Sequence, residues 1–165
     1  MPLGAVKVGL FAAAGAGGAA TGAGYFGGGF SSTDTVDKFA FSDDSRSTLG
    51  TGLSAARYDL AGMANSGTAG YFGGGTTGTV VATVDKFAFS DDSRTTLGTG
   101  LSAARKQLAA MANSGTAGYF GGGYSGGSVA TVDKFAFSDD SRTTLGTGLS
   151  TARRMLGAMA NAGVL

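Results

Sequence analysis

Three copies of an Asp-Asp pair, each flanked by serines, carry the residue types best suited to chemistry: Asp43-Asp44, Asp91-Asp92 and Asp139-Asp140. Carboxylates and hydroxyls can bind calcium, and two neighbouring acids can share the roles of general acid and base. The full alternating ligand pattern of a calcium-binding loop is missing, however, and acid–base catalysis needs a pocket rather than three equivalent segments. We therefore interpret each pair as a solvated hairpin turn, with Arg94 as the ion-pair partner in the second copy.

Three arginines, Arg57, Arg105 and Arg153, occupy one repeated position. A guanidinium group binds a carboxylate through two parallel hydrogen bonds, so these side chains could line a rim that grips acidic groups. The interpretation we favour is that they pack and hydrogen-bond between repeated units. The recurring "GYFGGG" lacks the Lys-Ser/Thr ending and the strand-to-helix context of a phosphate-binding loop, and we predict no phosphate site there.

Several residue types that most enzymes need are absent from the 165-residue chain, which contains no His, Cys, Trp or Glu. Without His and Cys there is no Ser-His-Asp or Cys-His nucleophile system and no common zinc ligand set. The formal net charge of +1 provides no basic field for a phosphate backbone. We therefore expect no enzyme activity, no catalytic residue, no cofactor, no metal and no nucleic-acid partner.

The N-terminal residues contain one lysine and a short apolar stretch, Val8–Ala14, as a secretory signal would. We expect this segment to be part of the fold rather than a removed signal. It is too short to span a membrane, so no membrane partner is expected. The lack of cysteine favours a cytoplasmic or virion location.

One unit recurs every 48 residues: Thr83–Ser102 is identical to Thr131–Ser150 and differs from Thr35–Ser54 only at Ser47. Such a period predicts stacked units or propeller blades, which cannot bury their faces alone. Within a unit, "TAGYFGG", "TVDKFAFS" and "RTTLGTGL" are predicted strands. The segment "SAARKQLAAMANSG" has the composition of a helix, but its hairpin context favours an inner strand at Leu108–Ala112.

The order of these features resembles a kelch repeat. In that family an Arg precedes the inner strand, a glycine pair closes the next strand, and an aromatic residue lies on the third. The corresponding residues here are Arg57, Arg105 and Arg153; the pairs Gly27-Gly28, Gly73-Gly74 and Gly121-Gly122; and Phe41, Phe89 and Phe137. The family's outer-strand Trp has no counterpart. The resemblance implies a propeller fold with a scaffold or protein-binding role, and it transfers no catalytic residue. We predict that the arginines and glycine pairs are structural residues of the blade joints.

The expected fold class is all-β, with propeller blades of four antiparallel strands, three per chain, in a single repeat domain. The predicted boundaries are 1–54 for the first blade with a degenerate N-terminal strand, 55–102 for the second, 103–150 for the third, and 151–165 for an inner strand that completes a blade of a partner chain. Because rings usually have about 4–8 blades, we expect closure by homo-oligomerisation. A six-bladed homodimer is favoured, and a homotrimer is the alternative.

The units differ mainly in the loops between the second and third strands and just after the repeated Arg. Loops on a rigid scaffold carry recognition, although relaxed constraint on exposed loops explains the same variation. The candidate partner-contact residues are Phe30, Asp34, Tyr58, Thr76, Thr77, Lys106, Tyr124, Ser125 and Arg154. The expected function is a structural or binding module that presents these loops to a protein or glycan, for example in a phage virion or tail. The alternative is a lectin with one shallow site per blade.

Overall fold

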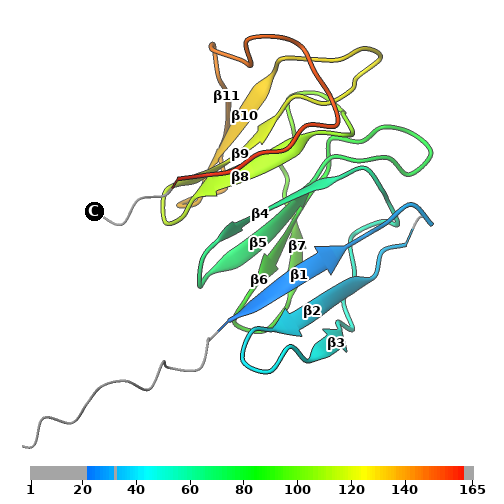
Figure 1. Ribbon diagram of the computed structural model, residues 1–165, viewed down its shortest axis with the longest axis vertical. Helices are drawn as coiled ribbons and strands as arrows, with labels where there is room; N and C mark the ends of the chain where they lie inside the picture. The colour runs from blue at the N-terminus through cyan, green and yellow to red at the C-terminus, as the bar shows by residue number, and fades with distance from the viewer. Residues whose placement is uncertain (1–21, 32, 162–165) are drawn as a thin grey trace, which may run out of the picture.

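A computed structural model describes residues 22–31 and 33–161, and its regular secondary structure is entirely β in these ranges (Figure 1). The predicted N-terminal strand at Val8–Ala14 lies outside them. No helix in the described ranges is long and apolar enough to cross a membrane. The strands are β1 (Ala23–Gly27), β2 (Val36–Ala40), β3 (Arg46–Thr48), β4 (Ala61–Asn65), β5 (Ala69–Gly73), β6 (Val84–Ala88), β7 (Arg94–Thr96), β8 (Ala109–Asn113), β9 (Ala117–Gly121), β10 (Val132–Ala136) and β11 (Arg142–Thr144).

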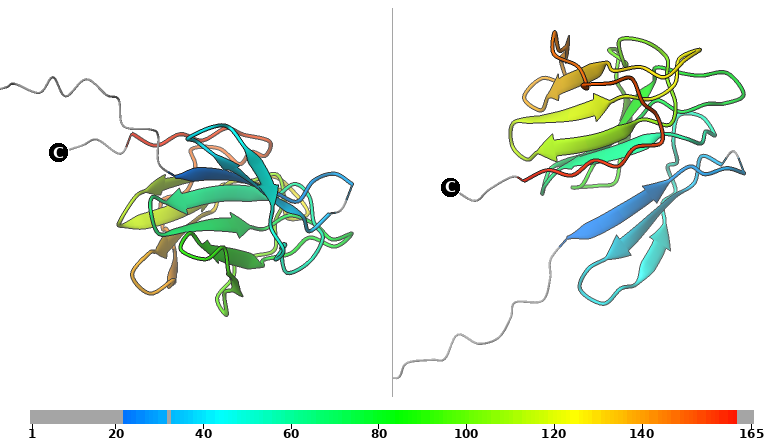
Figure 2. Two further views of the ribbon diagram at one scale, coloured as in Figure 1. Left: turned by 90° about the horizontal axis from the view of Figure 1, so that it is seen from below. Right: turned by 45° about the horizontal axis from the view of Figure 1, so that its top comes forward.

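These strands form three antiparallel sheets in chain order, which we call sheet 1 (β1–β3), sheet 2 (β4–β7) and sheet 3 (β8–β11). Each sheet is a meander in which sequential strands are neighbours. Sheet 2 lies between the other two, and the sheets resemble successive blades (Figure 1). The loops that join β1 to β2, β5 to β6 and β9 to β10 lie at the same end of the stack (Figure 2). The all-β prediction and the repeated sheets are therefore confirmed, whereas no closed ring is formed within the described chain.

The segment with helix-like composition forms strands, β4 and β8, as its hairpin context predicted. β8 begins one residue later than the predicted Leu108. Asp59 and Gln107, each two residues before the start of β4 or β8, adopt positive φ angles of 58° and 56°. A left-handed residue turns the chain and cannot continue a strand. In the hairpin that follows, Met63 lies opposite Tyr71, and Tyr71 lies opposite Lys86. The pairing places these side chains on one face of sheet 2.

Within the described residues, the inner strand predicted in the segment 151–165 is not formed, and sheet 1 has three strands rather than the predicted four. Residues 156–160 run as an unpaired segment, red in Figure 1. A strand exists only where a neighbour satisfies its backbone groups, and no such neighbour lies beside this segment in the described ranges. The residues leading into it nevertheless follow the repeat: the N–H of Met155 donates to the carbonyl of Gln107 over 2.8 Å, as the N–H of Gln107 donates to Asp59.

The larger hydrophobic core lies between sheets 2 and 3 and comprises Met63, Ala69, Tyr71, Val84, Leu101, Leu108, Phe120 and Phe135. A smaller one joins sheets 1 and 2 through Val36, Leu53 and Phe87. Neighbouring aromatic residues in one strand face opposite sheets, as the strand period requires. Tyr71 stacks on Phe137 of sheet 3, with ring centroids 5.4 Å apart, while Phe72 lies against Gly27 of sheet 1.

The glycine pair Gly73-Gly74 serves two different physical needs. A Cβ on Gly73 would lie 2.6 Å from the ring of Phe120. The absence of a side chain at Gly73 therefore leaves room for an aromatic ring of the next sheet. Gly74 has a φ of +69°, and a Cβ there would lie 2.5 Å from the carbonyl oxygen of Arg105. Only glycine combines that backbone conformation with so close an approach. The recurrence of "GYFGGG" follows from this joint.

Candidate functional site

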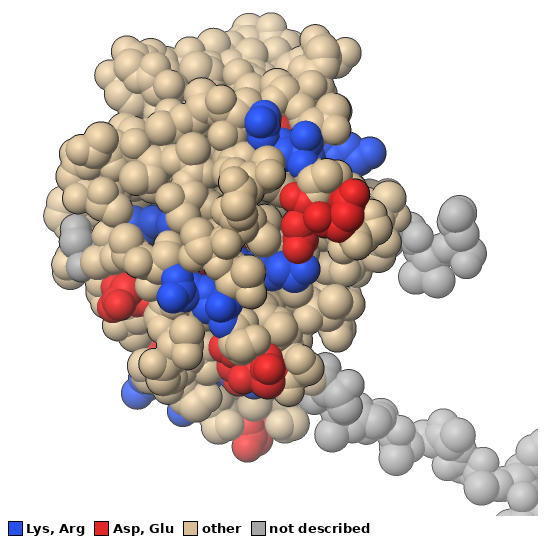
Figure 3. Space-filling model, turned by 180° about the vertical axis from the view of Figure 1, so that it is seen from behind, with Lys and Arg blue, Asp and Glu red and all other residues tan. Residues whose placement is uncertain are grey.

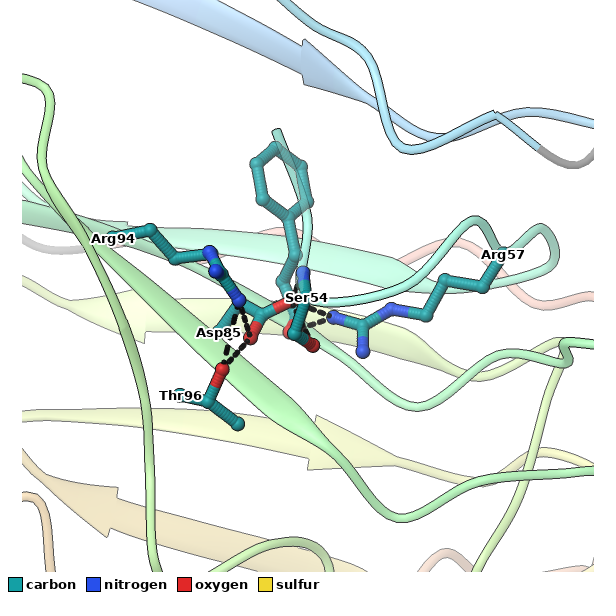
Figure 4. A network of polar contacts seen from close by, with 6 residues as sticks. Ser54, Arg57, Asp85, Arg94 and Thr96 are labelled. Carbon is teal, nitrogen blue, oxygen red and sulfur yellow. Dashed lines mark hydrogen bonds and ion pairs between the residues drawn. The ribbon is translucent and has the colours of Figure 1, made fainter. Parts of the chain in front are cut away.

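A buried ionic cluster lies where the chain passes from sheet 1 into sheet 2 (Figure 4). At its centre is Asp85 of β6, which is fully buried. One carboxylate oxygen, Oδ2, accepts hydrogen bonds from the N–H and hydroxyl of Ser54 and from Nη2 of Arg57, each over 2.9 Å. The other, Oδ1, accepts from Thr96 over 2.7 Å and lies 3.7 Å from Nη1 of Arg94. Asp85 thus ties the incoming linker to the sheet.

The same cluster recurs around Asp133 of β10, where Ser102, Arg105 and Thr144 donate to the carboxylate over 2.7–2.9 Å. Burial raises the pKa of Asp133, but hydrogen bonds from the Ser102 backbone and from the Thr144 and Ser102 side chains outweigh it, and the net pKa is below the ordinary value. The Arg105 guanidinium is also buried and donates to the carbonyl of Phe120 over 3.0 Å.

The arginine positions differ in what they do. Arg57 and Arg105 are each about 1% exposed, so neither lines an accessible rim. Burial lowers the pKa of the Arg57 guanidinium, and its ion pair with Asp85 offsets part of that effect. Arg153, by contrast, is exposed, and no carboxylate in the described part of the chain pairs with it.

The turn aspartates have a role that differs from the predicted one. Asp92 accepts a hydrogen bond from the Tyr25 hydroxyl and an ion pair from Lys38, both over 2.7 Å and both across the gap between sheets 1 and 2. Asp140 receives the equivalent bonds from Tyr71 and Lys86 of sheet 2.

These aspartates are therefore intersheet anchors rather than merely solvated turns. Arg94 does not pair with its adjacent turn as we predicted. It donates to Thr96 and faces Asp85 instead. Burial is the main reason that the pKa values of the Tyr25 and Tyr71 hydroxyls are raised. The sequence shows a Tyr, a Lys and an Asp in every unit, but it does not show that they bond between units.

Five of the nine predicted contact residues form a continuous surface at the loop end of the stack, which we call the aromatic strip: Phe30, Tyr58, Lys106, Tyr124 and Arg154. The rings of Phe30 and Tyr58 meet edge to face with centroids 5.4 Å apart. Lys106 lies over Tyr58 at 5.9 Å and pairs through its backbone with Tyr124, whose ring Arg154 covers at 4.7 Å.

The other four predicted contact residues lie outside the strip. Thr77 and Ser125 are exposed at loop tips, and Asp34 is exposed while its carbonyl accepts from Leu53. Thr76 is 3% exposed and bridges through its backbone to Tyr58 and Val80, so its side chain is unsuited to touching a partner. Of the predicted blade-joint residues, Arg57, Arg105 and the glycine pairs Gly27-Gly28 and Gly73-Gly74 lie at contacts between sheets. The nearest neighbours of the third pair, Gly121-Gly122, belong to the third unit and to the segment that follows it in the described chain.

Two hollows lie between elements of the stack. The larger, of about 1070 Å³, is bounded by β1 on one side and by β4 on the other, with Met63 and Tyr71 in its wall. The smaller, of about 200 Å³, lies beside Gly121, Leu149 and Leu156. In the described residues no group of three or more acidic side chains is placed to hold a metal ion. On the face shown in Figure 3, acidic and basic side chains form small adjacent groups rather than one large patch of a single sign.

No family model matches the chain, and no curated protein matches it.

Proposed function

We propose that this protein is a non-enzymatic structural module, a kelch-like array of blades that assembles with itself and presents the aromatic strip to a protein partner, for example in a virion or tail. The observation that carries the proposal is the strip itself, which draws on all three units. Supporting it, the buried carboxylates Asp85 and Asp133 are engaged by structural hydrogen bonds and ion pairs, so they are not free for acid–base work.

The strip combines aromatic faces with two cations, Lys106 and Arg154, and this combination suits a protein surface that carries carboxylates. Tyr and Arg are enriched at protein interfaces because they offer a large rigid area together with hydrogen-bond donors. Lys106 is held by Asp59 at 3.7 Å, and Arg154 is held over Tyr124. The charges are thus positioned before any partner arrives, which lowers the ordering cost of binding.

A second candidate function is glycan binding, with one shallow site per blade. The residue Phe30 is 87% exposed, and an accessible aromatic side chain of this kind suits stacking on a sugar. The equivalent position of the second unit is the buried Thr76, so the three sites would not be equivalent. This inequality is why we favour a single protein-binding strip.

Two arrays distinguish these functions. On a peptide array we expect the wild-type protein to retain carboxylate-rich peptides, and we expect K106S/R154S to lose them. On a glycan array we expect no binding to any sugar family that is reduced by adding the free sugar. The double variant T79A/S128A, which changes exposed loop residues outside the strip, is the matched control and should behave as wild type.

Competable binding to one sugar family, lost in F30S/Y124S but kept in the control, would replace the proposal with the lectin function. Peptide binding that is unchanged in K106S/R154S would show that the aromatic strip is not the surface that binds the peptides.

A further inference from the structure

We infer that the outer faces of sheets 1 and 3 bind each other in trans. Sheet 3, Ser150, Arg153 and residues 156–160 of one copy dock on sheet 1 of a second copy, whereas the side chain of Arg154 stays over Tyr124 of its own chain. The inference deepens the proposed self-assembling scaffold, on which it rests, by naming the partner and the residues that join the copies. The argument uses the contacts that already join sheet 1 to sheet 2 and sheet 2 to sheet 3. At each outer face, one of the two sets of interacting residues is present without the set that it meets elsewhere in the described chain. We call each such unmatched set a half-contact.

The first half-contact is the ionic cluster. Asp37 of β2 is the counterpart of Asp133; it bonds to Arg46 and Thr48 of its own sheet, and its side chain is 32% exposed. The missing half is a Ser and an Arg from a preceding linker. Ser150 and Arg153 are such a pair, both exposed, in the linker that leaves sheet 3.

The two upstream positions that correspond by the 48-residue repeat do not carry a Ser and an Arg. One repeat length before Ser54 and Arg57 the sequence has Val6 and Gly9, which have no side-chain donor. A second copy's Ser150 and Arg153 therefore fit Asp37 by charge and by hydrogen-bonding type, as Ser102 and Arg105 fit Asp133.

The second half-contact is the tyrosine–lysine pair that binds a turn aspartate of the next sheet. Tyr119 and Lys134 occupy this position in sheet 3, and in the described chain neither bonds to a carboxylate. The turn that they would meet is that of sheet 1, where Phe41 is 55% exposed and Asp44 is exposed. Tyr25 and Tyr71 each stack on a Phe and donate to an Asp at just these turn positions.

The third half-contact is an aromatic ring that packs against a glycine of the neighbouring sheet. We call this glycine the seat of the ring. Phe72 lies against Gly27, and Phe120 lies against Gly73. The third seat, Gly121, has no ring over it in the described structure, and the smaller hollow opens beside it. The third ring is Phe26 of sheet 1, which is 72% exposed, whereas Phe120 is fully buried.

The last half-contact is the inner strand. No strand of the described residues pairs with the edge of β1 that faces away from β2, and the larger hollow lies between β1 and β4. In sheets 2 and 3 the equivalent edge is covered by β4 and β8. Residues 156–160, "LGAMA", closely match "LAAMA" of the β8 segment, and all except the half-buried Leu156 are exposed. We assign this segment of a second copy as the strand that fills the hollow.

Backbone hydrogen bonds between successive units also predict this junction. Gln107 donates to Asp59, and Met155 donates to Gln107, so in a joined pair the N–H of Asp59 in one copy is placed to donate to Met155 of the other. The contact is heterologous, and two copies related by a two-fold axis satisfy it twice. They would form a ring of six sheets, within the usual range of roughly 4–8 blades.

Light scattering after size exclusion tests the junction through charge reversal. We expect the wild-type protein to have twice the 16.1 kDa chain mass, and the single variants R153D and D37R each to have the mass of one chain. An equimolar mixture of R153D and D37R should regain the double mass, because each junction then pairs an Asp with an Arg. R154D, which reverses the adjacent exposed arginine, is the control and should remain a dimer.

A wild-type monomer would overturn the inference, as would a dimer that survives both single reversals. A trimer that both reversals dissociate would support the junction and overturn the two-copy ring. Far-UV circular dichroism of each variant should show the wild-type β spectrum, which separates lost assembly from lost folding. As a second measurement, deletion of residues 154–165 should yield a folded monomer; if it leaves the dimer intact, residues 156–160 are not the joining strand.

The outcome is separable from that of the proposed function. R154D should lose the carboxylate-rich peptides while it keeps the double mass. A dimer that binds a sugar family would support the junction and overturn the protein-binding strip. A monomer that still binds the peptides would overturn the junction and support the protein-binding strip.

Discussion

The interface between sheets 2 and 3 and the outer face of sheet 1 contain nearly the same residues in different surroundings. Asp133 is fully buried, whereas the side chain of Asp37 is 32% exposed. Phe120 is fully buried, whereas Phe26 is 72% exposed. The local sequences around these pairs are almost identical, so the difference comes from the neighbour that each sheet has. Burial in this protein is a property of the interface between units rather than of the unit.

The largest expected effect concerns the buried cluster. Asp133→Ala should destabilise the protein by about 3–5 kcal/mol, because it leaves the Arg105 guanidinium buried without its counter-charge. Asp37→Ala, tested in the monomeric R153D background, should lower the free energy of unfolding far less, because Arg46 remains exposed to solvent. Urea unfolding measures both. Equal losses would show that the two clusters are not distinguished by burial.

The next effect concerns the tyrosine that bridges sheets 2 and 3. Tyr71→Phe removes a 2.8 Å hydrogen bond to the Asp140 carboxylate and should cost about 1.5–3 kcal/mol. Tyr119→Phe in the R153D background removes a hydroxyl that bonds to no carboxylate of the described chain, and the stability should change little. Thermal unfolding compares them. If Tyr119→Phe were as costly as Tyr71→Phe in the monomer, the outer face of sheet 3 would already be partnered within one chain.

A smaller effect is expected at the glycine joint. Gly74→Val places a β-branched residue at a φ of +69° and close to the Arg105 carbonyl, and such strain costs about 1–3 kcal/mol. Thr77→Val lies on an exposed loop tip, where most changes stay within about 0.5 kcal/mol. Melting temperatures of the two variants should therefore differ clearly. Identical values would mean that the joint tolerates a side chain.

The smallest effect is on the pH dependence of stability. The folded-state pKa of Asp133 lies below its unfolded value, so its stabilising contribution is complete above about pH 4 and is lost as the pH falls through the folded pKa. Thr144→Val removes one hydrogen bond that lowers this pKa and should make the acid loss shallower. Thr143→Val, at the exposed neighbouring position, is the control. The free energies of unfolding of the wild type and of the two variants should be measured at several pH values between about 2 and 6. Identical pH dependence in all three proteins would contradict the role of the Thr144 hydrogen bond.

Much of the fold could be predicted from local sequence. The period of the repeat, the all-β class and the inner strands β4 and β8 follow from patterns within one unit and its hairpin context. The bonds between sheets could not be predicted in this way. Tyr71 and Asp140 are 69 residues apart, and nothing in either segment identifies the other. The burial of Thr76 was also missed, because its neighbours in the loop have the composition of an exposed turn.

The amino-acid sequence by itself determined where most strands and turns form, because strand alternation, glycine conformation and turn chemistry act over a few residues. Residues 156–160 are the exception, because their near-copy in β8 has a strand neighbour and they have none within the described chain. Only the tertiary structure decided which copy of each residue is buried, which carboxylate meets which cation, and which residues of separate units share the aromatic strip. The physical reason is that desolvation and ion pairing depend on what packs against a side chain. Three almost identical units therefore acquire different properties from their positions in the stack.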